Sequence, residues 1–374
     1  MPYEQFNRFA VKMDSLASRR NKFDIENIRV RPDDTPRDLS PPDIEVVDEA
    51  TERIIKARRD GRAVMITFGA HAIKNGLGPV FIRMLEQGHV THLATNGAGI
   101  IHDWEFAFQG ESCEDVRQMV EEGRFGNWEE TGFNINLALN VGAYEGLGYG
   151  ESIGAMIQND GLNIPAPDTL AQVASERLKD DPETAAAAAD FLYIVRRFQL
   201  ASGKLAIPHP QKAYSVQAQA FRHGVPFTGH PMIGHDIIYN HPMNHCAALG
   251  RVAQRDFLAF AENVSRIDGG VYLSIGSAVM SPMIFEKSLS IAQNLAMQRG
   301  EHIDNHYILV VDLAESNWDW SKGEPPVEDP AYYLRYNKTF SRMGGTMRYL
   351  SADNRDFLLH LVQRLADRDA GCKP

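Results

Sequence analysis

Short apolar runs that end in glycine or in a polar turn recur along the chain and predict buried β-strands over residues 63–68, 92–95, 225–228, 270–275 and 306–312. Between and after these runs, apolar residues recur at helical spacing, which predicts helices over residues 43–59, 78–87, 244–262, 282–298 and 354–366. Strands that alternate with helices favour a parallel sheet covered by helices on both faces. The predicted fold class is therefore α/β, with a Rossmann-like, doubly wound and mostly parallel sheet.

Two segments depart from this alternation. The stretch over residues 27–42, NIRVRPDDTPRDLSPP, is rich in Pro, Asp and Arg and has no period, so residues 1–42 are expected to form an extended N-terminal arm. The middle of the chain predicts consecutive helices over residues 111–122, 134–144 and 182–200. We therefore expect a single α/β domain over residues 43–374, with a helical insertion at about 160–202.

Composition and charge narrow the classes of partner. The chain has 374 residues, of which 44% are hydrophobic, and its formal charge of -11 repels phosphate backbones and anionic lipids. No nucleic-acid or membrane partner is expected, and no apolar run reaches the roughly 18 residues of a membrane span. The cysteines, Cys113, Cys246 and Cys372, are too widely spaced for a metal knuckle or a disulfide framework. With no signal-peptide pattern at the N-terminus, these features predict a cytoplasmic protein.

Glycine-rich and polar segments follow the first two predicted strands, where the ligands of doubly wound sheets bind. Residues 68–76 read FGAHAIKNG, and residues 95–103 read TNGAGIIHD. Glycine in such turns lets backbone N–H groups approach an anionic or ribose-bearing ligand. Neither segment is a GxGxxG motif, and βα turns also need glycine for conformational reasons alone.

Five segments resemble, in consistent order, motifs of the deoxyhypusine synthases, over roughly residues 60–345. Residues 95–103 resemble the T-T-A-G-G-I-E-E-D loop of that family, and residues 123–127 resemble its G-R-x-G-N segment. Residues 225–236 resemble its I-P-V-F-x-P-A-L-T-D strand end, with one extra residue, and residues 275–279 resemble its G-G-G-V turn. Residues 329–338 resemble the P-D-E-A-V-S-W-G-K stretch that carries the catalytic lysine of the family.

The resemblance implies a Rossmann-like sheet, bound NAD and a homo-oligomer, either a dimer or a tetramer. It also implies a transferase that uses redox chemistry, in which NAD oxidises an amine and Lys338 captures the resulting imine. Two departures favour a different substrate. Residues 281–283, Ser-Pro-Met, replace two consecutive histidines of the family, and Ile101 and His102 replace paired glutamates that would attract a polyamine. We therefore expect a small amine or amino-acid-derived substrate rather than deoxyhypusine synthesis itself.

The catalytic candidates are Lys338, His102, His235 and Asp236. A lysine that forms an imine must be neutral, and the tyrosines that flank Lys338 could desolvate it. The alternative is that Lys338 is an ordinary surface lysine. The histidines and Asp236 follow strands and could move protons. The NAD site is expected at Gly69, Ala70, His71, Thr95, Asn96, Gly97, Ala98, Asp103, Gly276, Ser277 and Asp312, with helix capping as the alternative role for Asp103.

A histidine-rich stretch over residues 230–246 leaves two other functions open. The intervals between its histidines match neither HExxH nor a knuckle, so no metal site is predicted. The same histidines could serve a hydrolase or a deaminase that uses no redox chemistry, and this is the alternative function. Because the paired histidines of the family are missing, the protein could also be a catalytically inactive one that binds NAD or another nucleotide.

Overall fold

The computed structural model describes residues 3–371, so Cys372 lies outside the described residues. The chain groups into two compact units. The first contains the described residues of Met1–Asn27 together with Ile100–Phe221 and Gly229–Asp256, and the second contains Ile28–Gly99, Arg222–Thr228 and the described residues of Phe257–Pro374. The grouping into compact units does not show that either unit folds on its own. The expected domain boundaries and the helical insertion therefore stay predictions.

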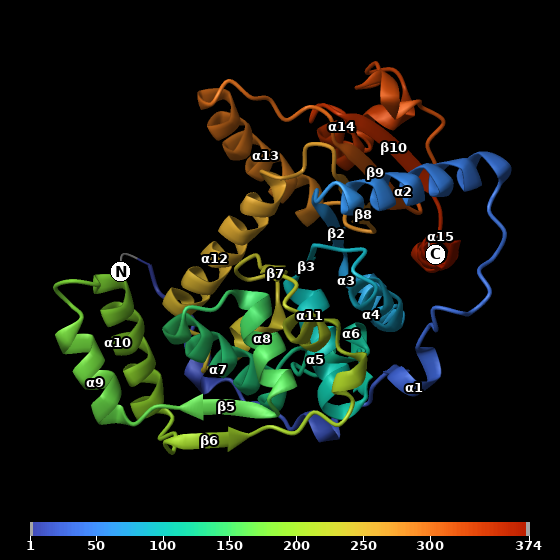
Figure 1. Cartoon of the computed structure of the whole chain (residues 1–374). Helices are drawn as coiled ribbons and strands as arrows, with labels where there is room; N and C mark the ends of the chain where they lie inside the picture. Colours follow the sequence, from blue (N-terminus) through green and yellow to red (C-terminus); the bar gives the residue numbers. More distant parts are fainter. Residues whose placement is uncertain (1–2, 372–374) are drawn as a thin grey trace. The chain divides into compact units, whose positions relative to one another are not determined.

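The second unit is built on a six-stranded sheet, to which the end of β7 is contributed by the first unit (Figure 1). Its order is β10-β9-β8-β2-β3-β7, and each pairing from β10 to β3 is parallel. The strands are β2 (Val64–Phe68), β3 (His92–Asn96), β7 (Phe227–His230), β8 (Val271–Ile275), β9 (Tyr307–Asp312) and β10 (Thr346–Ser351). The predicted α/β, Rossmann-like fold class is confirmed, although β10 was not predicted.

Helices cover both faces of this sheet because its central strands are apolar on both sides. Every residue of β2 and of β8 is buried. On one face Tyr272 and Met65 pack with aromatic residues of α13 (Met280–Gln298), α14 (Arg335–Phe340) and the end of α12 (Cys246–Val264). A separate helical layer consists of α15 (Asn354–Gly371), which packs against α2 (Pro41–Arg59) and α4 (Gly78–Glu86). The short α3 (Ala70–Lys74) follows β2 directly.

The first unit is mainly helical. It contains most of α5 (Gly97–Gln109) and of α11 (Val216–His223), with α6 (Val116–Glu121), α7 (Glu129–Glu145), α8 (Tyr149–Gln158), α9 (Pro167–Glu176) and α10 (Pro182–Arg197). Two strand pairs complete it, β1 (Phe23–Asp24) with β4 (Glu111–Ser112) and β5 (Gly161–Ile164) with β6 (Gly203–Ala206). The α9–α10 pair lies between β5 and β6 in the chain, within the segment that the sequence marks as helical (Figure 1).

The segment before α2 lacks regular structure over residues 29–40, apart from a turn. Within the second unit, Arg37 of this segment bonds Asp356 at 2.7 Å and Asp353 at 2.9 Å. Its extended conformation is therefore anchored at the start of α15. No helix among the described residues has the length and apolar character needed to cross a membrane.

Candidate functional site

The direction in which the sheet grows changes between β2 and β8. From β2 the chain adds β3 and then β7 on one side, and it later adds β8, β9 and β10 on the other. Doubly wound sheets bind their ligands outside the carboxyl ends of the strands at this kind of switch point. The residues at the switch point are Gly69, directly after β2, and Gly276, directly after β8.

Gly69 and Gly276 meet through their backbones. The Gly69 N–H donates to the carbonyl of Ile275 at 3.0 Å, and a Cβ on Gly69 would lie 2.1 Å from the Gly276 carbonyl oxygen. Gly276 has a φ of 54°, and a Cβ there would lie 2.6 Å from the side-chain nitrogen of Asn354. Both positions therefore exclude side chains, and the two strand ends stay in contact.

A cavity of about 260 Å³ opens beside these glycines, and we call it the switch-point cavity. Its walls come from the segments that follow β2, β8, β9 and β10. They consist of His71, Asn75, Leu77, Gly276, Asp312, Leu313, Asp353, Asn354 and Arg355. His71, Gly276 and Asp312 are three of the predicted cofactor contacts, and the structure brings them together around this one cavity.

Two oxygens in the switch-point cavity have bonding capacity to spare. Asn354 Oδ1 is buried and has no hydrogen-bond partner among residues 3–371. Asp312 Oδ1 accepts bonds from the backbone N–H groups of Leu313 at 2.7 Å and Ala314 at 3.3 Å, which fix the carboxylate. Its Oδ2 has no bond to any described residue. A buried polar atom without a partner is costly, so Asn354 Oδ1 indicates a place for a polar ligand, and Asp312, which is partly exposed, adds a carboxylate oxygen to the same cavity wall.

The acidic residues at the start of α15 are neutralised by arginines. Arg37 bonds both Asp353 and Asp356, and Arg355 bonds Asp356 at 2.9 Å. Burial raises the pKa of Asp356, but the hydrogen bonds from Arg37 and Arg355 outweigh it and the pKa is lowered overall. The start of α15, which lines the cavity, thus has its carboxylates paired, and Asp353 also accepts the Arg355 N–H at 2.9 Å, which caps the helix.

The other predicted cofactor contacts of the second unit lie in the same set of strand ends: Ala70, Thr95, Asn96, Gly97, Ala98 and Ser277. Several of their side chains hold turns. Thr95 donates to the Phe68 carbonyl at 2.8 Å, Asn96 accepts from the Gly99 N–H at 2.9 Å, and Ser277 accepts from the first turn of α13 at 3.2 Å. None lines the switch-point cavity, so their contact with a cofactor stays a prediction.

Asp103 lies in the first unit and caps α11. Its carboxylate accepts bonds from the Ser215 hydroxyl at 2.6 Å, the Val216 N–H at 2.8 Å and the Gln217 side chain at 2.9 Å. Burial raises the pKa of Asp103, while these hydrogen bonds act to lower it. Asp103 lies inside α5 and caps α11, which is far from it in the chain, so it does not cap the helix that directly follows it, as the sequence alternative had it. Both carboxylate oxygens are engaged within the protein, and contact of Asp103 with NAD stays a prediction.

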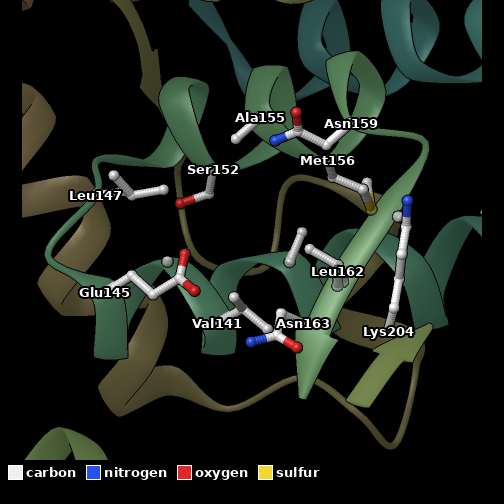
Figure 2. A pocket seen from close by; sticks show the side chains of 13 residues that line it. Val141, Glu145, Leu147, Ser152, Ala155, Met156, Asn159, Leu162, Asn163 and Lys204 are labelled. Carbon is white, nitrogen blue, oxygen red and sulfur yellow. The ribbon is translucent and has the colours of Figure 1, made fainter. Parts of the chain in front are cut away.

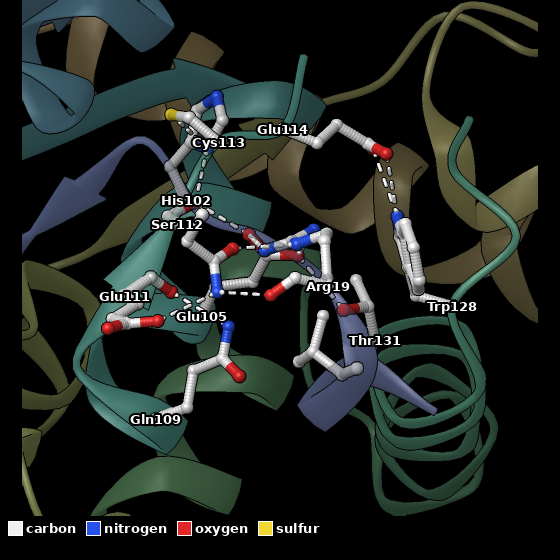
Figure 3. Close-up of polar contacts among 12 residues, drawn as sticks. Arg19, His102, Glu105, Gln109, Glu111, Ser112, Cys113, Glu114, Trp128 and Thr131 are labelled. Atoms are coloured by element: carbon white, nitrogen blue, oxygen red, sulfur yellow. Dashed lines mark hydrogen bonds and ion pairs between the residues drawn. The ribbon is translucent and has the colours of Figure 1, made fainter. Parts of the chain in front are cut away.

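His102 is connected to a buried ion pair (Figure 3). Its Nδ1 lies 2.8 Å from the Ser112 hydroxyl, which donates to Glu105 at 2.5 Å. Arg19 binds Glu105 through two bonds of 2.8 and 2.7 Å. Burial raises the pKa of Glu105, but the charge and hydrogen bonds of Arg19, together with His102 and the Ser112 hydroxyl, outweigh it and the pKa is lowered overall. Because Ser112 gives its only proton to Glu105, His102 Nδ1 carries the donated hydrogen, which orients the ring for proton transfer.

Asp236 and two nearby tyrosines have buried oxygens without hydrogen-bond partners, and we call these three oxygens the Asp236 cluster. They are Asp236 Oδ2, Tyr149 Oη and Tyr239 Oη, none of which has a hydrogen-bond partner in the part of the chain that is described. Burial raises the pKa of Asp236 to about 6. Burial, and then the nearby charge of Asp236, raise the pKa of both tyrosines. A protonated amine has three N–H donors and fits these three acceptors.

Asp256 places Tyr149 at the end of β7. Its fully buried carboxylate accepts from the N–H groups of Gly150 at 2.9 Å and Gly229 at 2.6 Å, and burial raises the pKa of Asp256 to about 8. A Cβ on Gly229 would lie 3.1 Å from the Tyr149 ring. The Asp236 cluster therefore lies beside Gly229 and Gly150, within the first unit.

The histidines of the 230–246 stretch have separate surroundings. His235 is exposed, and its charge lowers the pKa of Asp236 against the larger effect of burial. His241 lies 3.2 Å from Glu129, and His245 lies 3.9 Å from Asp190. Within residues 3–371 no three His, Cys, Asp or Glu side chains are placed to hold a metal ion.

Lys338 lies on α14 of the second unit and is paired. Its Nζ is 2.9 Å from Glu324 and 3.2 Å from the centroid of the Tyr332 ring, and its side chain is 16% exposed. Burial lowers the pKa of Lys338, but Tyr332 and Glu324 outweigh this and raise it. The predicted aromatic wall is present, but the pair favours the ammonium form over the neutral amine that an imine requires.

Sequence reasoning missed several residues of these sites. Asn354 and Arg355 follow the unpredicted strand β10, and their only signal is that a predicted helix begins at Asn354. Tyr149 and Tyr239 lie in helical segments with no motif around them. The spare hydrogen-bonding capacity that marks these residues exists only in the folded chain.

No protein-family model and no curated protein matches the chain, so the resemblance to deoxyhypusine synthases rests on the five segments alone. Similar solved structures include AgrE in a ternary complex with ornithine and NAD+, at 16% identity over 90% of this chain and 35% of that one, with a TM-score of 0.44. A conserved putative LOR/SDH protein from Methanococcus maripaludis S2 has 11% identity over 90% of this chain and 71% of that one, with a TM-score of 0.41.

A third similar structure is ArgZ, an arginine dihydrolase from the ornithine-ammonia cycle in Cyanobacteria. It has 13% identity over 86% of this chain and 32% of that one, with a TM-score of 0.41. The chain spans about a third of the length of AgrE and of ArgZ. These likenesses assign neither a family nor an activity to it.

The contact between Gly69 and Gly276 makes a testable prediction. Gly69→Ala forces the end of β8 away from β2 and is expected to lower the free energy of unfolding by about 2 kcal/mol or more, as overpacking does. Chemical denaturation measures this change. Gly250→Ala is the matched control, because a Cβ there meets nothing within 4 Å, and it should stabilise α12 by up to about 1 kcal/mol. Equal free energies for Gly69→Ala and the native chain would contradict the close approach.

Proposed function

We propose that the protein is an NAD-dependent enzyme that oxidises a small amine or an amino-acid-derived substrate to an imine. The observation that carries the proposal is the switch-point cavity, where Asn354 Oδ1 and Asp312 Oδ2 are unpaired at the position that holds dinucleotides in Rossmann sheets. The Asp236 cluster supplies the amine site. His102, oriented by Ser112, is the further candidate for moving protons.

The residues present fit NAD. Asp312 Oδ2 would accept a ribose hydroxyl, and Asn354 Oδ1 would accept a second hydrogen-bond donor of the cofactor. A volume of about 260 Å³ accommodates part of a dinucleotide. When bound, NAD supplies an acceptor for hydride.

The Asp236 cluster fits the substrate ammonium. Asp236 Oδ2, Tyr149 and Tyr239 would each accept one of its N–H groups. Oxidation of the carbon that carries nitrogen first requires the amine to lose a proton. A carboxylate whose pKa is raised to about 6 holds a proton more strongly than an ordinary aspartate, which suits Asp236 to receive it.

Lys338 has the role implied by the resemblance, capture of the imine. For this step its ammonium must give up a proton, and Glu324, at 2.9 Å, is the base within reach. The neutral amine then attacks the imine carbon, the bond from this carbon to the original nitrogen breaks, and that nitrogen leaves as an amine that takes up the proton held by Glu324. Where this transfer does not occur, water captures the imine and the enzyme is an oxidoreductase rather than a transferase.

NAD binding tests the cofactor site. We expect a saturable rise in melting temperature with NAD, and an affinity about tenfold weaker for Asp312→Asn, since a hydrogen bond to a charged group contributes about 1.5 kcal/mol. Asparagine keeps the Oδ1 turn, so the fold is preserved. Asp33→Asn, at an exposed aspartate of the same unit, should bind like the native chain. No rise with NAD, or equal affinity for Asp312→Asn, would overturn the assignment.

The pH dependence of amine binding tests the Asp236 cluster. Binding needs an ionised Asp236, so it should weaken as the pH falls through about 6. Asp236→Asn should abolish binding of primary amines while leaving NAD binding intact, and Asp180→Asn, at an exposed position, should change neither. Calorimetric titration of a panel of primary amines across this pH range measures both effects. An affinity for amines that changes neither with pH nor with the Asp236→Asn substitution would refute the site.

Lys338 is tested by chemical trapping. Borohydride reduction during turnover should link the substrate carbon to Lys338, and Lys338→Met should lose both the adduct and transfer while keeping NAD binding. Lys322→Met, a neighbouring exposed lysine, should retain the adduct. Full turnover by Lys338→Met without an adduct would show that water captures the imine.

A further inference from the structure

A second cavity, of about 470 Å³, lies wholly within the first unit (Figure 2). Helices α7 and α8 line it together with β5 and Lys204 of β6. Its volume is in the range of small-molecule sites. None of its lining residues belongs to the switch-point cavity or to the Asp236 cluster.

The walls between the two ends of this cavity are apolar. Val141, Leu147, Met156 and Leu162 are among the residues that line it, and Met156 and Leu162 are buried. Small residues of α7 and α8 leave the space between them open. Such a surface suits an aliphatic chain and contains no aromatic ring on which a base could stack.

Opposite charges stand at the two ends. In Figure 2, Glu145 lies at one side of the cavity with Leu147 and Ser152, and Lys204 lies at the other side with Asn159. Neither Glu145 nor Lys204 has an ion pair or a side-chain hydrogen bond with any residue from 3 to 371. Burial raises the pKa of the Glu145 carboxyl. The residue as a whole is exposed, as are Lys204, Asn159 and Asn163, so both charged ends of the cavity are open to solvent.

Two side-chain amides accompany Lys204. Asn163 of β5 is the register partner of Lys204 on β6, so both side chains project from the same face of the strand pair. Asn159 follows α8, and in Figure 2 Met156 lies between it and Lys204. Neither amide has a side-chain hydrogen bond to a described residue. This end therefore offers an ammonium and two amides, a donor set that suits a carboxylate.

We propose that this cavity binds an aliphatic amino acid whose ammonium and carboxylate stand at opposite ends of a chain of methylenes. The ammonium would pair with Glu145, the methylenes would cover the apolar wall, and the carboxylate would meet Lys204, Asn159 and Asn163. A diamine would place a cation against Lys204, and a dicarboxylate would place an anion against Glu145. The ω-amino acids and the extended basic amino acids avoid both repulsions.

The experiment compares 5-aminopentanoate with two analogues of the same length, pentanoate and pentylamine, by calorimetric titration of the full chain. The Asp236→Asn variant is the background, so that amine binding at the Asp236 cluster does not contribute. We expect saturable binding of 5-aminopentanoate and at least tenfold weaker binding of each analogue. Glu145→Gln and Lys204→Met should each weaken binding at least tenfold.

Matched controls are Glu121→Gln and Lys179→Met, exposed positions of the same unit, which should bind like the background. Absence of saturable binding, equal affinity for pentylamine, or binding unchanged by Glu145→Gln and Lys204→Met would each overturn the proposal. The analogue series needs no cavity variant, so it stands even where a variant fails to fold. Since NAD binding is measured separately and involves none of these residues, the two proposals fail independently.

Discussion

The parallel pairing of β2 with β8 is the contact on which the switch-point cavity depends. Phe68 and Ile275 are register partners, so the two strands end level and the turns after them meet at Gly69 and Gly276. β9 pairs with β8, and β10 with β9, which brings Asp312 and Asn354 to the same edge. A polar site is thereby assembled from turns that are far apart in the chain, and its position follows from strand order rather than from a local motif.

The strands that the sequence predicted are those buried on both faces. β2 and β8 form uninterrupted apolar runs, so their positions follow from composition alone. β10 is different, because Arg348 and Tyr349 interrupt its apolar pattern at the edge of the sheet, where one side has no neighbouring strand. Because β10 was not predicted, nothing in the sequence placed the segment that follows it at a strand end. Asn354 was therefore not among the predicted site residues.

The site residues were harder to predict, since the partner of a side chain is set by the fold. Asp103 follows a predicted strand, as a cofactor ligand would, but its carboxylate bonds Ser215, 112 residues away. The tyrosines near Lys338 were visible in the sequence, whereas its pairing with Glu324 was not. The rule of strand ends needs only the strands themselves, and it selected His71, Gly276 and Asp312, which line one cavity in the structure. Local pattern thus indicates where polar residues gather and leaves open which bonds they make.

The unpaired oxygens of the Asp236 cluster have a consequence for the lifetime of the protein. Buried polar atoms without partners weaken the folded state, and a ligand that satisfies them stabilises it by mass action. Local opening is the step that exposes a chain to proteases, and its frequency falls as the folded state gains stability. A ligand that occupied these oxygens would therefore slow degradation, so the amount of the protein would rise with the supply of that ligand.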